Sequence, residues 1–62
     1  RPQPGPESAR VLALLREDAL AGVDELVERT GCSVSEILTA LLDLELKGWV
    51  AAHPGQRFQR RP

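Results

Sequence analysis

The segment SVSEILTALLDLELKGWV, residues 33–50, contains the clearest structural signal in the sequence. Its first four residues have the spacing of a capping box, in which the Ser33 hydroxyl accepts from the N–H of Glu36 and the Glu36 carboxylate reaches back. Apolar residues then recur at helical spacing to about Lys47, and Gly48 suits the left-handed position that ends a helix. The segment therefore predicts one helix between Ser33 and Gly48.

Two shorter helices are predicted before this segment. The first covers residues 6–16, because proline is well tolerated at the first helical position. The second covers residues 24–30, with Asp24 as its N-cap and Gly31 as its left-handed end. Between the two helices, residues 20–23 have the composition of a short strand.

A β-hairpin is predicted after the long helix. Residues 49–52 and 56–59 are its strands, and Pro54-Gly55 is the turn between them. Helix, strand, helix, helix, hairpin is the order of a winged helix-turn-helix. We therefore predict a mainly α fold of three helices with a small β-hairpin wing.

Length and composition limit the organisation of the chain. Its 62 residues allow one small domain, which we place at residues 7–60. The opening RPQPGP, residues 1–6, is interpreted as an interdomain linker of a longer protein, and residues 61–62 as a C-terminal tail. No stretch is apolar enough for a membrane span and no signal peptide is visible, so we expect a cytoplasmic protein without membrane contact.

Residue types for cofactor chemistry are scarce. One cysteine excludes an internal disulfide, and with a single histidine it leaves no Cys/His metal site. We expect Cys32 to be a buried, inert thiol and His53 to be exposed. The sequence has no glycine-rich phosphate loop and no nucleophile–base pair. We therefore predict no enzyme activity, no cofactor and no metal.

The charges are distributed unevenly along the chain. Nine acidic and four basic residues lie between Glu7 and Ala52, which makes the helical body acidic. The remaining four basic residues are Arg1, Arg57, Arg60 and Arg61. Any attraction to phosphate must therefore come mainly from the C-terminal end.

The third helix has unusual residues on the face that a winged helix commonly places in the DNA major groove. Reading base edges requires donors and acceptors, most often Arg, Lys, Asn or Gln. Only Ser35 and Thr39 offer donors on this face, and acidic residues nearby repel phosphate. The outward positions are Ser35, Leu38, Thr39, Leu42, Asp43 and Leu46.

Leu38, Leu42 and Leu46 form a stripe with a spacing of four residues. Three explanations remain open: the first helix or the linker covers the stripe, another protein or a second copy of the chain covers it, or it contacts DNA. We predict a protein-interaction site that consists of these leucines together with Thr39 and Asp43.

The wing has a weaker nucleic-acid signal. Arg57, Arg60 and Arg61 predict weak, salt-sensitive phosphate contacts that do not depend on base sequence. The alternative is a solvated tail. We expect Phe58, between them, to fill the core between wing and helices.

Several of these segments together resemble the C-terminal winged-helix domain of the bacterial DNA-processing protein A (DprA, also called Smf) family. The resemblance rests on VL at residues 11–12, DEL at 24–26 with TG at 30–31, LLDLELKGWV at 41–50, and PG at 54–55 with Phe58. It implies a parent protein that binds single-stranded DNA through a separate Rossmann-like domain and helps to load the RecA recombinase during natural transformation. It further implies that the winged helix is an accessory module.

We therefore predict a non-catalytic module that acts mainly in protein–protein interaction or self-association, with weak DNA contact through the wing. One alternative is a double-stranded DNA-binding domain of the transcription-regulator type. Another is a structural cap that docks on the Rossmann-like domain of the parent protein.

Overall fold

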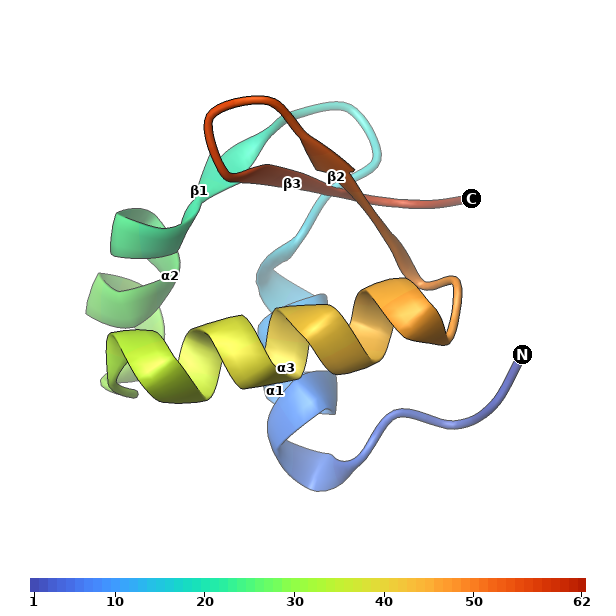
Figure 1. Ribbon diagram of the computed structural model, residues 1–62, viewed down its shortest axis with the longest axis horizontal. Coiled ribbons are helices and arrows are strands. Elements are labelled where there is room, and N and C mark those ends of the chain that lie inside the picture. The colour runs from blue at the N-terminus through green and yellow to red at the C-terminus, as the bar shows by residue number, and fades with distance from the viewer.

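The computed structural model describes all 62 residues and shows three helices with a three-stranded antiparallel sheet (Figure 1). Helices account for just under half of the residues, so the mainly α description holds only modestly. The winged helix prediction is confirmed. In chain order the elements are α1 (Pro6–Leu14), β1 (Ala21–Gly22), α2 (Val23–Thr30), α3 (Val34–Leu46), β2 (Val50–His53) and β3 (Arg57–Arg60).

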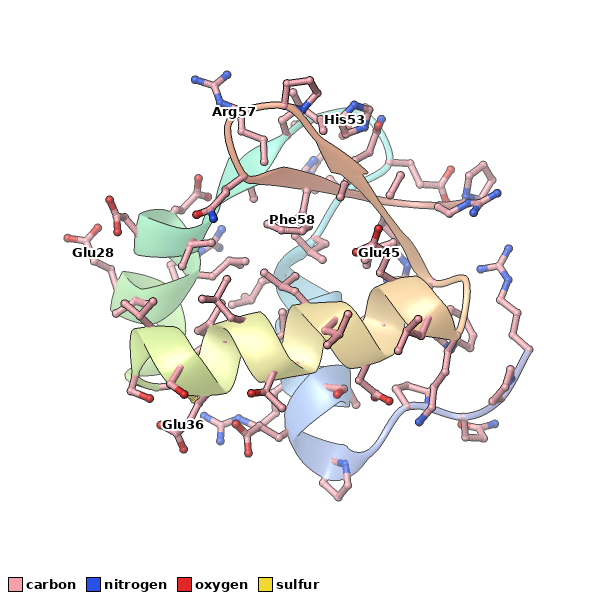
Figure 2. The ribbon with its side chains drawn as sticks, in the orientation of Figure 1. Glu28, Glu36, Glu45, His53, Arg57 and Phe58 are labelled. Carbon is pink, nitrogen blue, oxygen red and sulfur yellow. The ribbon has the colours of Figure 1, made fainter.

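The sheet has the strand order β1-β3-β2, so the last strand of the chain is the central one. Phe58 of β3 lies opposite Ala21 on one side and Ala52 on the other. Its side chain is buried and points from the sheet toward α3 (Figure 2). Phe58 thus fills the space between wing and helices, as predicted.

One apolar core joins all six elements. On α3, the four residues Ile37, Ala40, Leu41 and Leu44 point into it, as their helical spacing predicts. The other members of the core are Val11, Leu12, Leu15, Ala21, Val23, Leu26, Val50 and Phe58. Because α1 and α2 both pack on the inner side of α3, the opposite side of α3 remains at the surface.

The capping box is confirmed. The Glu36 N–H donates to the Ser33 hydroxyl at 3.1 Å, and the Ser33 N–H donates to the Glu36 carboxylate at 2.8 Å. Gly48 adopts a left-handed conformation with φ 83°, which ends the helix as predicted.

The first two helices differ from the sequence prediction at their ends. Helix α1 ends at Leu14 because Leu15 takes an extended conformation that buries its side chain in the core. Helix α2 begins at Val23 with Gly22 as its N-cap, so the prediction of Asp24 as N-cap is wrong. Asp24 lies instead in the first turn, where its charge favours the helix dipole.

The hairpin strands begin one residue later than predicted. Gly55 and Gln56 both adopt positive φ angles, 83° and 55°, and therefore belong to the turn. His53 is half-buried rather than exposed, and its Nε2 lies 2.9 Å from Oε1 of Gln59 on the neighbouring strand. Cys32 is half-buried against the core rather than fully buried.

Residues 1–5 form no helix or strand and run beside the end of α3, and the two chain ends lie on the same side of the molecule (Figure 1). None of the three helices has the length and apolar character required to cross a membrane.

Candidate functional site

The exposed side of α3 presents three leucines, which we call the leucine face: Leu38, Leu42 and Leu46. These residues are 39%, 57% and 78% exposed, respectively. Leu38 is therefore partly covered, whereas Leu42 and Leu46 are mostly open to solvent. Leu41, which precedes Leu42 in the sequence but points into the core, is 1% exposed. Large apolar side chains grouped on one helix face indicate a surface that another molecule contacts.

The polar residues of this face offer few groups for reading DNA bases. The Thr39 hydroxyl donates to the Ser35 carbonyl oxygen at 2.9 Å, so its only hydrogen is already used within the helix. Ser35 is exposed and is the one remaining neutral donor beside the leucine face. This side of α3 therefore lacks most of the donors that a base-reading helix presents.

Asp43 is separated from the leucine face by its contacts with α1. Its carboxylate accepts from the Ser8 hydroxyl at 2.9 Å and lies 3.1 Å from Nζ of Lys47. The hydrogen bond from Lys47, followed by that from Ser8, lowers the pKa of Asp43 below its usual range. The structure thus brings Leu38, Leu42, Leu46 and Thr39 together, whereas Asp43 joins α1 to α3.

We did not predict from the sequence that Ser8 is the hydrogen-bond partner of Asp43. It is the one buried polar residue of the chain, and it lies on the same side of α1 as Val11 and Leu12. A small hydroxyl residue within an apolar stripe was the available signal, since a buried hydroxyl requires a hydrogen-bond partner.

Acidic residues flank the leucine face. Glu36 lies on the side of α1 and Glu45 on the side of the sheet (Figure 2), and both are exposed. The hydrogen bonds from the backbone and side chain of Ser33 lower the pKa of Glu36. Arg10 of α1 lies close enough to Glu36 to contribute to this lowering, and Lys47 at the end of α3 is paired with Asp43. Glu45 makes no salt bridge, so the surroundings of the leucine face are negative on the side of the sheet.

The three wing arginines do not form one patch. Arg57 is exposed at the wing turn and points away from the helices (Figure 2), and Arg61 is exposed near the C-terminus. Arg60 is half-buried, on the same face of β3 as Phe58. Arg57 and Arg61 are four residues apart, about 13 Å along an extended chain. The wing therefore presents two separated exposed arginines rather than one basic patch.

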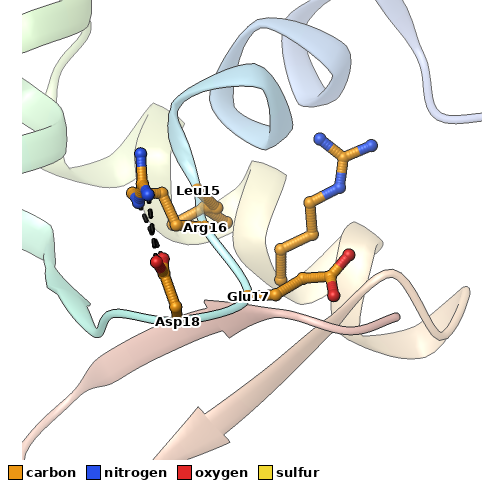
Figure 3. A pocket seen from close by; sticks show the side chains of 5 residues that line it. Leu15, Arg16, Glu17 and Asp18 are labelled. Carbon is orange, nitrogen blue, oxygen red and sulfur yellow. Dashed lines mark hydrogen bonds and ion pairs between the residues drawn. The ribbon is translucent and has the colours of Figure 1, made fainter.

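Arg60 lines an open pocket of about 490 Å³ together with Leu15, Arg16, Glu17 and Asp18 (Figure 3). The Arg16 guanidinium donates two hydrogen bonds, of 2.8 and 3.0 Å, to the Asp18 carboxylate. These bonds lower the pKa of Asp18 below its usual range. The charges of Glu17 and Asp18 balance those of the two arginines that line the pocket, so it has no net positive charge to attract phosphate. The pocket has neither a nucleophile with a base nor three metal-ligating side chains.

Comparisons with known proteins agree on one family. The family model described as the DprA winged helix domain matches residues 1–56. Protein Smf of Escherichia coli K12 is 53% identical over 38 residues, which cover 61% of this chain and 10% of that protein. Protein Smf of Synechocystis sp. is 36% identical over 56 residues, which cover 90% of this chain and 14% of that protein.

The chain thus spans only about a tenth to a seventh of the length of these curated relatives. No solved structure matches it.

Proposed function

The chain belongs to the DprA winged helix domain family, and from this premise we propose that it is a non-catalytic module that binds another protein through the leucine face. The observation that supports this function is the exposure of Leu38, Leu42 and Leu46 on the side of α3 that a DNA-binding winged helix would turn toward bases. Apolar side chains gain free energy when a partner removes them from water, and leucine offers no hydrogen bond to a base edge.

The charges around the leucine face favour a particular partner. Glu36 and Glu45 are exposed on its two sides. Arg10 offsets part of the charge of Glu36, whereas Glu45 makes no salt bridge, so the charge beside the leucines is negative on the side of Glu45. A second copy of the chain would bring the same acidic residues into the interface and add repulsion. We therefore propose a helix of another protein whose apolar stripe is flanked by Lys or Arg.

Three leucines make a small surface compared with the roughly 800 Å² that each partner buries in a stable complex. A weak, transient complex is the expected result. The wing adds only weak phosphate contacts that do not depend on sequence, through Arg57 and Arg61.

For the parent protein, we propose a cytoplasmic DNA-processing role in natural transformation, with single-stranded DNA and RecA as partners. This part of the proposal rests on family membership. Within it, the winged helix adds a protein contact to a DNA-binding activity that resides elsewhere in the parent.

Two synthetic helical peptides test the choice of partner. Both have leucines at i, i+4 and i+8, and they differ only in having Lys or Glu on both sides of that stripe. Fluorescence anisotropy with labelled peptides should show that the chain binds the Lys peptide more tightly. Leu42→Glu should abolish this binding, and Glu45→Lys should greatly reduce the preference for the Lys peptide, because Glu36 is then the only acidic residue beside the leucines. Ser35→Ala, also on α3, is the control that should leave binding unchanged.

Sedimentation over a concentration series separates the alternatives. If the partner is another protein, the chain should be monomeric at the protein concentrations at which it binds the Lys peptide. A dimer that Leu42→Glu dissociates would instead identify a second copy as the partner. Sequence-selective binding of duplex DNA that Ser35→Ala weakens would identify a groove-reading helix. Binding of the isolated Rossmann-like domain of the parent, lost in Leu42→Glu, would identify a structural cap.

A further inference from the structure

The proline-rich N-terminal segment is held against the end of α3 by three side chains. The Trp49 indole N–H donates to the Pro2 carbonyl oxygen at 2.7 Å. The Lys47 ammonium donates to the Gln3 carbonyl oxygen at 3.3 Å. The Arg1 guanidinium lies over the Trp49 ring, 5.0 Å from its centre, within the range of a cation–π contact. The segment interpreted as a linker is therefore in contact with the domain.

These contacts match the way proteins recognise extended proline-rich segments. Proline at every second position, residues 2, 4 and 6, restricts the backbone and removes N–H groups, so the carbonyl oxygens are left as acceptors. Gly5 has φ −66° and ψ 170°, close to the polyproline II conformation. An aromatic ring beside donors that meet successive carbonyl oxygens is the surface such a segment requires.

The donors are themselves positioned by the fold. Lys47 is paired with Asp43, which in turn accepts from Ser8 of α1. The backbone N–H of Trp49 donates to the Leu44 carbonyl oxygen at 2.8 Å, and its carbonyl oxygen accepts from the Arg61 N–H at 2.9 Å. Both side chains therefore extend from fixed backbone, which lowers the entropy cost of binding an extended segment.

We propose that Lys47 and Trp49 form a binding site for an extended proline-rich segment with an arginine before its first proline, and that residues 1–5 occupy this site within the same chain. We call this pair the Lys47–Trp49 clasp. It is distinct from the leucine face and does not depend on the function proposed for that face. Its consequence is that the N-terminal segment has a defined path along the domain instead of moving freely.

Occupation within the same chain determines how the site must be tested. A short tether gives an effective concentration of the order of millimolar, so an added peptide competes poorly with the intact chain. The test therefore begins with a variant in which residues 1–4 are replaced by Gly-Ser-Gly-Ser. Gly5 and Pro6 are retained because they begin α1.

Trp49 is the only tryptophan, so its fluorescence reports on this site alone. In the Gly-Ser variant we expect the emission to shift to longer wavelength and acrylamide quenching to increase, because the ring loses its cover. Adding the peptide Arg-Pro-Gln-Pro-Gly-Pro should reverse both changes, while a Gly/Ser peptide of equal length should not. Circular dichroism should stay native, because residues 1–4 are outside every helix and strand.

The single substitution Gln3→Ser is the matched control. Gln3 contributes only its backbone carbonyl oxygen, so this variant should keep the fluorescence of the unmodified chain. Hydrogen exchange of the Trp49 indole N–H gives a second measurement: it should be slower in the unmodified chain than in the Gly-Ser variant. Equal emission and equal exchange in the two chains would overturn the proposal, as would a Gly-Ser variant that does not respond to the proline-rich peptide.

Discussion

Alanine substitutions at Leu41 and Leu42 provide the strictest test of the leucine face. These neighbours have the same side chain and belong to the same helix, but Leu41 is 1% exposed and Leu42 is 57% exposed. Leu41→Ala removes a fully buried side chain and leaves a cavity, which costs about 2–5 kcal/mol. A domain of 62 residues has a total stability of only about 3–9 kcal/mol, so this variant should lose a large part of its stability.

Leu42→Ala should have a much smaller effect. Complete burial of a leucine contributes about 1.5–3 kcal/mol, and less than half of the Leu42 side chain is buried. The expected loss is therefore about 1 kcal/mol or less, which lowers the melting temperature by at most about 4–8 °C in a domain of this size. The measurement is thermal unfolding by circular dichroism at several protein concentrations.

Each variant can refute a different part of the reasoning. Equal destabilisation in the two variants would mean that Leu42 is buried in solution, so that the leucine face is not available to a partner. A mild effect of Leu41→Ala would mean that α3 does not pack on α1 and α2 as described. If the loss in Leu42→Ala grew with protein concentration, self-association would be covering the face.

Three further predictions concern the helix cap, acid stability and the wing. Ser33→Ala removes the capping box and should reduce the free energy of unfolding by about 1 kcal/mol in urea denaturation. Because the folded-state pKa of Asp43 is lowered, its contribution to stability should be lost as pH falls below about 4 toward the folded pKa. The destabilisation in Ser8→Ala should accordingly be largest at neutral pH and shrink in acid, as measured by melting temperature against pH. Arg57→Ala combined with Arg61→Ala should weaken binding of single-stranded oligonucleotides at low salt and reduce its salt dependence, with no effect on helix content.

Local signals in the sequence predicted the elements of the fold. The capping box at Ser33 and the glycine at position 48 depend on backbone groups within a few residues, and the structure has both where the sequence predicts them. Regular spacing of apolar residues likewise identified the buried side of α3. Such features require no knowledge of distant parts of the chain.

Distant contacts determined what the sequence left open. Helix α1 ends early because Leu15 enters a core formed by other elements, and Gly22 replaces Asp24 as N-cap because β1 pairs with β3 just before it. The exposure of Leu42 depends on the fact that α1 and α2 pack against the other side of α3.

The distinction between local signals and distant contacts also applies to the leucine face and to the Lys47–Trp49 clasp. The sequence by itself determined that a leucine stripe lies on α3, since helical spacing is a local property. Only the tertiary structure decided that this stripe is uncovered, that Asp43 faces Ser8, and that the proline-rich segment meets Trp49. Spacing places side chains on a helix face, whereas burial and hydrogen bonding depend on residues as distant in the sequence as Pro2 and Trp49, which only the folded chain brings together.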